Sequence, residues 1–448
     1  MESETPLRQK PATPALSESS LWRYAAFTAL YVAQGLPTGL LIIALPAWLA
    51  NQGFSTAQIG GFIAIVTLPL SLKLVGGPLM DRFGFLPMGR RRPWVLAAQL
   101  GLLISFALMA AVPDPARNLD LVAAMGFVVS LCSALQDVAV DGMAIDLLPE
   151  DQRTRANGFM FGGKTLGVAA ASSGGGLVLS HYGFSPAILL IAGLLAVVVL
   201  FPLLLRERPG ERLLPWTPGK ASEAAVQLQL NDWRSIVGGL LRAFLLPMSL
   251  VAVLMIFVFR IGEGLLKAVL PVLTVQQLGW EDTDYSNLMA VAGVAAALTA
   301  MVLGATVIER LGKIRTIVIA NILLVVLGVA AGSLPHLWSS REAVAAYVIL
   351  TQMLYVTVAV AILATFMGMC WKRVAATQFT LYMALANLGH SAGAALAGPL
   401  DAAFEYHHTF FVLAAISVAA LALLSFVNLE AHQERLDSLD NREKQASG

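Results

Sequence analysis

The stretch GPLMDRFGFLPMGRRR, residues 77–92, decides the fold, because a shortened form of it returns in the second half of the chain. The second form is VIERLGKIR, residues 307–315. Each contains an acid, an arginine, one spacer and a glycine: Asp81, Arg82 and Gly84 in the first, and Glu309, Arg310 and Gly312 in the second. The repeat predicts a chain built from two related halves.

The composition of the whole chain is typical of an integral membrane protein. Of the 448 residues, 57% are hydrophobic and only 13% are charged. A soluble domain carries about 25% charged residues, so about half of the usual polar surface is missing. Long stretches that are apolar on all sides indicate helices that cross a bilayer.

Apolar stretches of bilayer-spanning length occur six times on each side of a polar segment. A bilayer core needs about 20 apolar residues per helix. We predict an all-α integral membrane protein with twelve transmembrane helices in two six-helix pseudo-repeats. The expected spans are 24–50, 59–80, 94–112, 119–147, 156–179 and 187–205, then 242–277, 285–308, 314–334, 343–370, 375–400 and 408–428.

The expected domains follow from these spans. They are a disordered cytoplasmic tail (1–22), a first half (23–205), a cytoplasmic linker (206–238), a second half (239–429) and a second cytoplasmic tail (430–448). Lys and Arg favour the cytoplasmic side of a membrane. The loops after even-numbered spans hold Arg90, Arg91, Arg92, Arg153, Arg155, Arg310, Lys313, Lys372 and Arg373, among others, whereas those after odd-numbered spans hold Arg117 and Arg341. Both termini are therefore expected in the cytoplasm.

The loop of residues 77–92 resembles the signature loop of the major facilitator superfamily, with an insertion, Phe85 to Gly89, before the arginines. The resemblance implies that the loop and its echo latch neighbouring cytoplasmic helix ends in one conformational state. A carboxylate can pair with loop arginines and cap a helix N-terminus. Ordinary anchoring by positive charge explains the arginines equally well. The candidate gating residues are Gly77, Asp81, Arg82, Gly84, Arg90, Arg91, Glu309 and Arg310.

Four other stretches resemble a narrower group, the AmpG-type muropeptide permeases with their acetyl-CoA carrier and RhtX/FptX siderophore permease relatives. The stretches are GRRRPW (89–94), SALQDVAVDGMAIDLLPEDQRTRANG (133–158), FRIGEGLLKAVLP (259–271) and ATQFTLYMALANLG (376–389). The resemblance implies movement of a solute across a membrane, coupled to protons. The solute differs among members of the group.

Ionisable groups within the expected spans each need a reason, because a charge at the centre of a membrane helix costs about 2.5 kcal/mol or more. Asp137 and Asp141 are four residues apart and share one face of their helix. Two carboxylates in a poorly solvated site are suited to holding a proton, so both are candidates for proton coupling. Lys164 is a plausible neighbour by depth and a candidate solute-binding residue. An interpretation that stays open is a buried Asp137–Lys164 pair that fixes helix packing.

Arg260, Glu263 and Lys267 also share one helix face. Arg260 and Lys267 are candidate solute-binding residues, since a guanidinium grips a carboxylate or phosphate with two hydrogen bonds. Glu263, between two bases, is a candidate for proton coupling through exchange of its partners. A salt bridge that holds the two halves together remains an equal alternative.

Four further polar residues lie within expected spans. Lys73 is a candidate for solute binding, although its ammonium group can also extend to the membrane surface. Gln34, with Gly35 and Pro37, disturbs the first helix near its middle, as at the edge of a cavity, and is a further candidate for solute binding. His390 is a candidate for proton coupling or a packing residue, and nearby Asn387 is a candidate for solute binding.

Residues 158–165, GFMFGGKT, match the phosphate-binding pattern GxxxxGK[ST]. That loop functions between a strand and a helix, and here it falls in the entry of a membrane helix. We therefore expect Gly158, Gly162 and Gly163 to allow close helix packing instead. We find no catalytic motif and expect neither an enzyme nor a cofactor or metal site.

The sequence thus predicts a secondary active transporter that moves an organic solute by alternating access, with proton-coupled uptake. The solute is expected to be a muropeptide, a siderophore or a similar anionic metabolite. The alternative is proton-antiport efflux, which a glycine run without proline, 174–176, disfavours. We expect a monomer in the inner membrane, with the bilayer, protons and the solute as partners and no nucleic acid.

Overall fold

The computed structural model describes residues 15–227, 238, 241–242, 244–305, 307–371 and 375–447. Within these ranges the regular structure is helical, apart from an isolated bridge between Ala15 and Arg206. Twelve long helical rods account for most of the described residues, and several rods contain a short turn of different pitch. The expected all-helical membrane fold is therefore confirmed.

The first six rods come from the first half of the chain. They are α1 (Ser20–Gly39) with η1 (Leu40–Ala44) and α2 (Leu45–Asn51); α3 (Thr56–Thr67) with η2 (Leu68–Leu72) and α4 (Lys73–Arg82); α5 (Arg92–Ala110); α6 (Leu119–Leu147); α7 (Glu150–Ala169) with η4 (Ala170–Gly175) and α8 (Gly176–Tyr182); and α9 (Phe184–Leu204). A short turn, η3 (Leu86–Met88), lies in the loop before α5.

The second six rods follow the linker. They are α12 (Pro247–Val272) with η5 (Leu273–Gln277); α13 (Asp282–Ala305); α15 (Lys313–Ser333); α16 (Arg341–Met369); α17 (Ala375–Ala403); and α18 (Tyr406–Leu424). Shorter elements are α10 (Glu223–Gln227), α14 (Val307–Leu311) and η6 (Pro335–Ser339), and the described chain ends in α19 (Leu429–Ser447). The rods lie within a few residues of the expected spans.

Nine rods in the described residues are long and apolar enough to cross a membrane by length and composition. The rods α7–α8 and α17 are less apolar, and α13 includes residues whose side chains lie outside the described part of the chain. These three also make contacts between the halves, since α7 packs on α13 and α17 packs on α3. A helix that faces protein instead of lipid needs less apolar surface, which explains the Gly- and Ser-rich α7–α8 and the polar side chains of α17.

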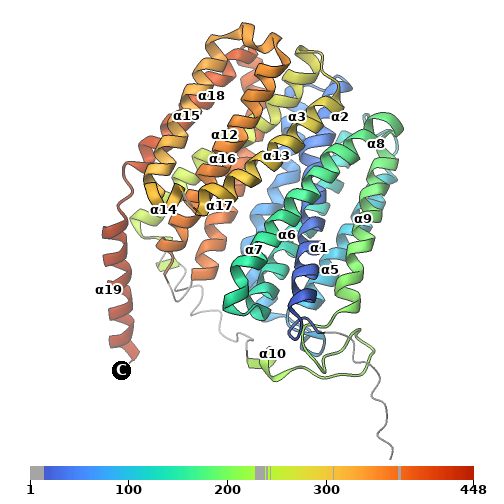
Figure 1. The fold of residues 1–448 in the computed structure, drawn as a ribbon, viewed down its shortest axis with the longest axis vertical. Helices are drawn as coiled ribbons and strands as arrows, with labels where there is room; N and C mark the ends of the chain where they lie inside the picture. The colour runs from blue at the N-terminus through green and yellow to red at the C-terminus, as the bar shows by residue number, and fades with distance from the viewer. Residues whose placement is uncertain are drawn as a thin grey trace, which may run out of the picture.

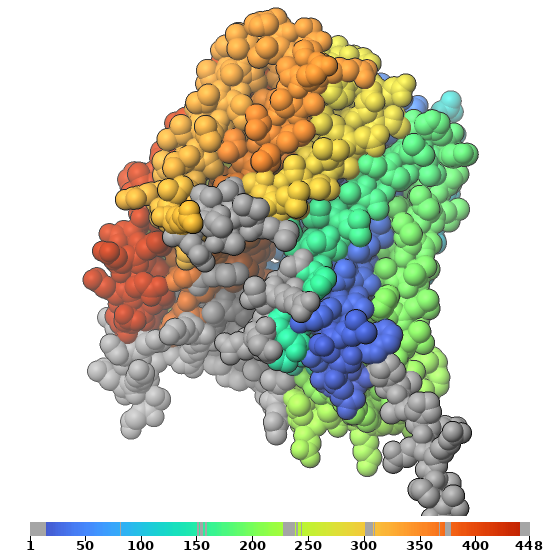
Figure 2. All heavy atoms as spheres, viewed as in Figure 1, coloured from blue at the N-terminus to red at the C-terminus, as the bar shows by residue number. Residues whose placement is uncertain are grey.

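Figure 1 shows the two halves side by side, blue to green and yellow to red. We call the end that carries residues 15–19, the loop 83–91 and α10 the linker end, and the opposite end the far end. The halves lie together toward the far end and diverge toward the linker end, where α19 also projects (Figure 1). The space-filling view shows the halves in contact where yellow α13 meets green α7 (Figure 2).

Glycines set the closest helix approaches in each half. A Cβ on Gly167 of α7 would overlap the carbonyl oxygen of Val32 on α1, and one on Gly264 of α12 would overlap that of His390 on α17. Small residues let membrane helices approach at backbone distance. The pairs α1–α7 and α12–α17 occupy corresponding places in the two halves, and both carry candidate site residues.

Two expectations about local structure need correction. The first helix does not break at Gln34 or Pro37: α1 continues to Gly39, and the irregular segment is the π-helical turn η1 that follows. The stretch 158–165 lies inside α7, as expected, and Gly163 packs against Thr28. Gly162, however, faces open space, so close packing does not explain it.

The predicted tails and linker are more ordered than expected in their described parts. Residues 15–22 are not disordered, because Leu16 is buried and donates its backbone N–H to the Arg206 carbonyl at 2.8 Å. Residues 206–227 fold against the first half and end in α10. The predicted C-terminal tail is the helix α19, which buries His432 and Leu436.

Candidate functional site

Charged residues of the first half lie on α4, α6 and α7, close to α1. The Lys73 ammonium forms an ion pair with Asp137, and the Tyr31 hydroxyl donates a hydrogen bond to Asp141. Both acids lie on α6, Tyr31 lies on α1, and Lys73 begins α4 directly after η2. The 3₁₀ turn η2 contains Pro69, and irregular backbone at membrane depth is tolerated where it is buried in protein or lines a water-filled cavity.

Lys164 is not the partner of Asp137, so the packing pair considered from the sequence is wrong. Asp137 pairs with Lys73, because α4 packs alongside α6. Lys164 instead interacts electrostatically with Asp141 in its own half and with Arg260 in the other half. It therefore belongs to the boundary between the two halves.

Charged residues of the second half lie along one face of α12. Glu263 forms ion pairs with Arg260 and, at 3.6 Å, with the Lys267 ammonium. His390 of α17 interacts electrostatically with all three groups. The expectation that Glu263 lies between two bases is confirmed.

The two clusters interact electrostatically across the boundary, and most of their charged side chains are partly exposed. The side chains of Lys73, Asp137, Arg260, Glu263 and Lys267 are between 14% and 22% exposed. Four basic and three acidic groups make up the clusters: Lys73, Lys164, Arg260 and Lys267, with Asp137, Asp141 and Glu263. They carry one excess positive charge, and Lys164 and Arg260, one from each half, lie close enough to repel each other electrostatically across the boundary.

Three neutral candidates occupy different settings. Gln34 is buried, and neither atom of its side-chain amide has a hydrogen-bond partner among the described residues. Asn387 donates its amide nitrogen to the Leu70 carbonyl of the other half at 3.1 Å, so that nitrogen is engaged in this conformation. His390 is buried beside the α12 cluster. Gln34 is thus the candidate with unused hydrogen-bonding capacity.

Hydrogen bonds between the halves close the far end. Gln276 of η5 donates its amide to the carbonyls of Ala50 at 2.8 Å and Phe54 at 2.7 Å. Deeper in the bundle, the hydroxyls of Thr67 on α3 and Ser391 on α17 are 2.8 Å apart. These bonds hold the halves together at the far end, whereas the ribbons of the two halves diverge toward the linker end (Figure 1).

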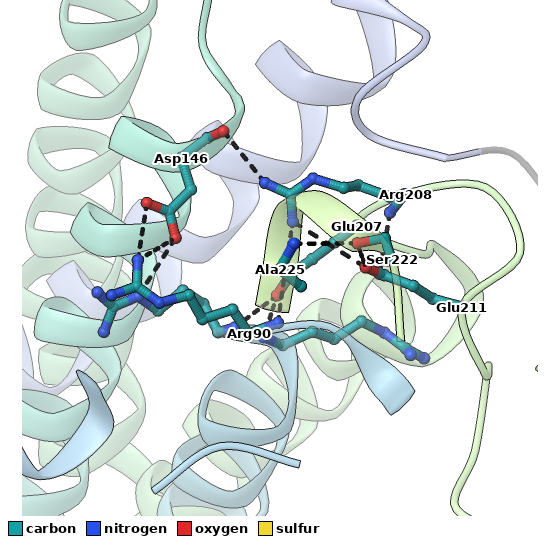
Figure 3. Close-up of polar contacts among 9 residues, drawn as sticks. Arg90, Asp146, Glu207, Arg208, Glu211, Ser222 and Ala225 are labelled. Carbon is teal, nitrogen blue, oxygen red and sulfur yellow. Dashed lines mark hydrogen bonds and ion pairs between the residues drawn. The ribbon is translucent and has the colours of Figure 1, made fainter. Parts of the chain in front are cut away.

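A second polar network ties the first half together at the linker end (Figure 3). The fully buried Glu207 carboxylate accepts hydrogen bonds from the backbone N–H groups of Arg90 at 3.0 Å, Arg91 at 2.7 Å and Arg92. It therefore caps the N-terminus of α5, where a negative charge is favoured. The Arg90 guanidinium holds both oxygens of Asp146 at 3.1 and 3.0 Å.

Arg92 and Arg208 complete this network. The buried Arg92 guanidinium donates to the carbonyls of Pro202 at 2.7 Å and of Arg212 at 2.9 Å, which joins the end of α9 to the linker. Arg208 reaches the carbonyl of Asp146 at 3.4 Å (Figure 3). The loop 83–91, the end of α6 and residues 206–222 therefore form one folded unit.

Comparison with known proteins decides the family. The family model described as Major Facilitator Superfamily matches residues 27–394 and 252–447. The chain belongs to the major facilitator superfamily. It is therefore a multi-pass membrane transport protein and not an enzyme.

Individual members of the superfamily are similar over most of the chain. The anhydromuropeptide permease of Escherichia coli (strain K12) is 28% identical over 406 residues, which cover 89% of this chain and 77% of that protein. The putative transporter AmpG 4 of Rickettsia felis is 23% identical over 408 residues, 89% of this chain and 95% of the relative. The crystal structure of a point mutant of the nucleoside transporter NupG aligns with a TM-score of 0.64 at 14% identity, covering 90% of this chain and all of that chain.

The superfamily signature loop is only partly visible as a latch. The side chains of Asp81 and Glu309 lie outside the described residues, and Arg82 and Arg310 are exposed. Gly77 and Gly84 make ordinary packing contacts. A carboxylate does cap a helix N-terminus here, as expected, but in the described structure that carboxylate is Glu207. Arg90 and Arg91 pair with Asp146.

Sequence reasoning missed Tyr31, Asp146 and Glu207. Glu207 had a usable signal, since it is an acid among arginines directly after the sixth span, in RERPGER. Tyr31 lies one turn before Gln34, on a helix that already holds a candidate residue. Asp146 carries no local signal, because its role depends on the loop folding back to the end of α6.

Proposed function

We propose that this transporter takes up an anionic organic solute together with protons, by alternating access across the inner membrane. The observation that carries the proposal is that two charged clusters, one from each half, lie close enough for Lys164 and Arg260 to interact electrostatically. An anion bound between two cations from separate halves would relieve their repulsion. A solute bound there would contact both halves at once, as the rocking of two repeats around a fixed site requires.

The similarity to the anhydromuropeptide permease suggests the class of solute. A muropeptide joins sugars to a short peptide and so offers carboxylates together with many hydroxyl and amide groups. We assign carboxylate binding to Arg260, Lys164 and Lys267, since a guanidinium can hold a carboxylate through two hydrogen bonds. Gln34 supplies a buried side-chain amide without a hydrogen-bond partner among the described residues. Lys73 and Asn387 complete the proposed solute site once they leave Asp137 and the Leu70 carbonyl and bind the solute instead.

Protons act through the acids of the same clusters. Protonation of Asp137 or Asp141 would raise the excess charge of the seven groups from one to two and release Lys73 or Tyr31. Each bound proton would then favour the anion, and each bound anion would favour the proton, because coupling between two ligands is reciprocal. Glu263 and His390 provide the corresponding proton path in the second half.

We assign the linker end to the cytoplasm, on the basis of the Lys and Arg in its loops. In the conformation described here, the hydrogen bonds of Gln276 then close the outward-facing end. The resemblance of the loop 77–92 to a gating latch suggests that Asp81, Arg82 and Glu309 with Arg310 fasten the cytoplasmic ends when the transporter opens outward. Tags on the two termini, tested for accessibility in intact cells, should both report from the inside.

Uptake of a radiolabelled anhydromuropeptide into proteoliposomes tests the proposal. We expect accumulation that depends on an inward proton gradient, loss of the gradient dependence in Asp141→Asn, and loss of uptake in Arg260→Gln. Asp120→Asn changes an acid in the first turn of the same helix, α6, far from the clusters, and should leave uptake unchanged. Uptake indifferent to the gradient would remove the coupling and leave a facilitator or an antiporter.

The same purified protein can distinguish between solute classes. Thermal unfolding is measured with an anhydromuropeptide, a siderophore and an acyl-CoA, each alone. A ligand that binds the folded state raises the unfolding midpoint to a degree set by its concentration relative to its Kd. Stabilisation by the muropeptide that disappears in Arg260→Gln supports the assignment, whereas stabilisation by another class alone would replace it.

A further inference from the structure

We infer that Glu405, His407 and His408 form a binding site for a divalent transition-metal ion at the far end of the second half. Their ligand atoms all lie within 4.8 Å of one another. Glu405 Oε2 is 3.5 Å from His407 Nδ1, and the two imidazole rings are 4.1 Å apart between centroids. The inference does not depend on the proposed transport function.

The chemistry of the group suits a metal ion. Neutral imidazole nitrogens and a carboxylate are ligands that Zn²⁺ and similar ions accept. One divalent cation can accept a lone pair from each imidazole and from the carboxylate. The negative charge of the carboxylate offsets part of the charge of the ion and part of the positive charge at the N-terminus of α18.

The surroundings hold the ligands near one another and leave them accessible. The His408 ring lies between Phe404 and Phe411, with centroids 6.3 and 6.4 Å away, and Tyr406 meets the His407 ring edge-on at 5.7 Å. Glu405 occupies the N-cap position of α18 but makes no side-chain cap hydrogen bond, and its side chain is 78% exposed. Its oxygen atoms are therefore available to an ion arriving from solvent.

The distances require a modest closure. Metal–ligand bonds of about 2.0–2.1 Å place tetrahedral ligand atoms about 3.3 Å apart. Rotation of an exposed glutamate and of two rings at a helix start can supply that change. Three protein ligands leave one coordination position to water, so the bound ion would exchange with solution.

The position gives the ion a mechanical consequence. Glu405 follows the last residue of α17, Ala403, almost directly, and the histidines begin α18. Since α17 packs on α3 of the other half, an ion here would fix one end of a helix that lies at the boundary between the halves.

Zn²⁺ titration in competition with a chromophoric chelator tests the site on the full-length protein, purified without a polyhistidine tag. We expect one Zn²⁺ per chain, with His407→Ala, His408→Ala and Glu405→Gln each weakening binding by about tenfold or more, since even outer partners of metal ligands contribute about 10–100-fold. His336→Ala removes an exposed histidine in η6 of the same half and should bind as the unmodified protein does.

X-ray absorption of the bound zinc provides a second measurement that does not depend on variants. It should show nitrogen and oxygen ligands at about 2.0–2.1 Å with imidazole scattering. Unfolding midpoints without metal should be equal among the variants, which shows that they fold. No stoichiometric Zn²⁺ on the unmodified protein, or an equal loss in His336→Ala, would overturn the site.

Discussion

Glu207 shows how one side chain can organise a helix terminus and a linker at the same time. Its carboxylate accepts three consecutive backbone N–H groups from Arg90 to Arg92, while its own backbone carbonyl receives the N–H of Ser17 at 2.9 Å. Burial, together with the nearby charge of Glu211, raises the pKa of Glu207 to about 6, against an ordinary value of 4.5. The residue therefore titrates closer to neutral pH than an exposed glutamate.

Glu207→Gln should lower stability by about 1–3 kcal/mol, because the amide nitrogen replaces an acceptor and leaves a buried N–H unpaired. The folded pKa lies above the unfolded one, so the folded state of the unmodified protein binds the extra proton as pH falls from about 6 to 4.5. The unmodified protein should thus gain stability relative to the glutamine variant in that window. Thermal unfolding of both proteins in detergent at pH 7 and pH 5 measures the difference.

Glu223→Gln is the matched control, since Glu223 is an exposed acid at the start of α10 on the same linker. Surface substitutions usually change the free energy of unfolding by no more than about 0.5 kcal/mol. Glu223→Gln should therefore change the unfolding midpoint and its pH dependence only slightly. If the stability difference between the unmodified protein and Glu207→Gln is smaller at pH 5 than at pH 7, Glu207 does not titrate with a raised pKa.

At the scale of elements, the close pairing of α1 with α7 depends on glycine at particular positions. Gly163 and Gly162 are neighbours on α7, but a Cβ on Gly163 would lie 2.6 Å from the Thr28 carbonyl oxygen, whereas nothing lies within 4 Å of one on Gly162. The two residues share sequence context and backbone conformation. They differ in what each faces.

Gly163→Ala should therefore be less stable than Gly162→Ala by about 1–3 kcal/mol, the usual cost of adding a methyl group to a tight contact. Replacing glycine by alanine raises helix propensity by about 1 kcal/mol in both variants, so this contribution cancels in the comparison. Midpoints of thermal unfolding in one detergent measure the remaining difference in stability between the two variants. Equal midpoints would mean that α1 and α7 are not held at backbone distance.

The same pair of glycines marks the limit of predicting elements from sequence. Apolar length predicts where each rod begins and ends to within a few residues, because lipid imposes that length on every crossing. It does not predict which face of α7 meets α1, since both faces are small and apolar. The helix α19 was likewise predicted as a tail, because its docking needs Trp371 and Leu246, which other parts of the chain supply.

At the scale of the whole molecule, the sequence placed ionisable residues within the spans but could not place the two halves against each other. The face shared by Arg260, Glu263 and Lys267 follows from helix geometry alone, and the structure agrees. The electrostatic interaction of Lys164 with Arg260 and the pairing of Lys73 with Asp137 depend on contacts between helices distant in sequence. Those contacts arise from packing, which no local pattern encodes.

The halves are also held in one arrangement by bonds that single substitutions can remove. At the far end, Gln276 provides both hydrogen bonds from η5 to Ala50 and Phe54. Net hydrogen bonds contribute about 0.5–1.5 kcal/mol each. Alternating access, as proposed above, requires that they break when the far end opens.

Gln276→Ala should therefore shift the population toward the conformation open at the far end by about 1–2 kcal/mol, a factor of about 5–30. Spin labels at His181→Cys and His336→Cys, on exposed far-end positions of opposite halves, report this opening as a longer distance in double electron–electron resonance. Cys132 and Cys370 are replaced by serine so that only these sites carry labels.

Gln277→Ala changes the neighbouring exposed glutamine, whose side chain takes no part in these two bonds, and should keep the short distance. The comparison separates loss of the bonds to Ala50 and Phe54 from a general disturbance of the π-helical turn η5. If both variants lengthen the distance equally, the turn itself holds the far end closed. If neither does, the closure depends on the deeper packing of α3 against α17, where Thr67 meets Ser391.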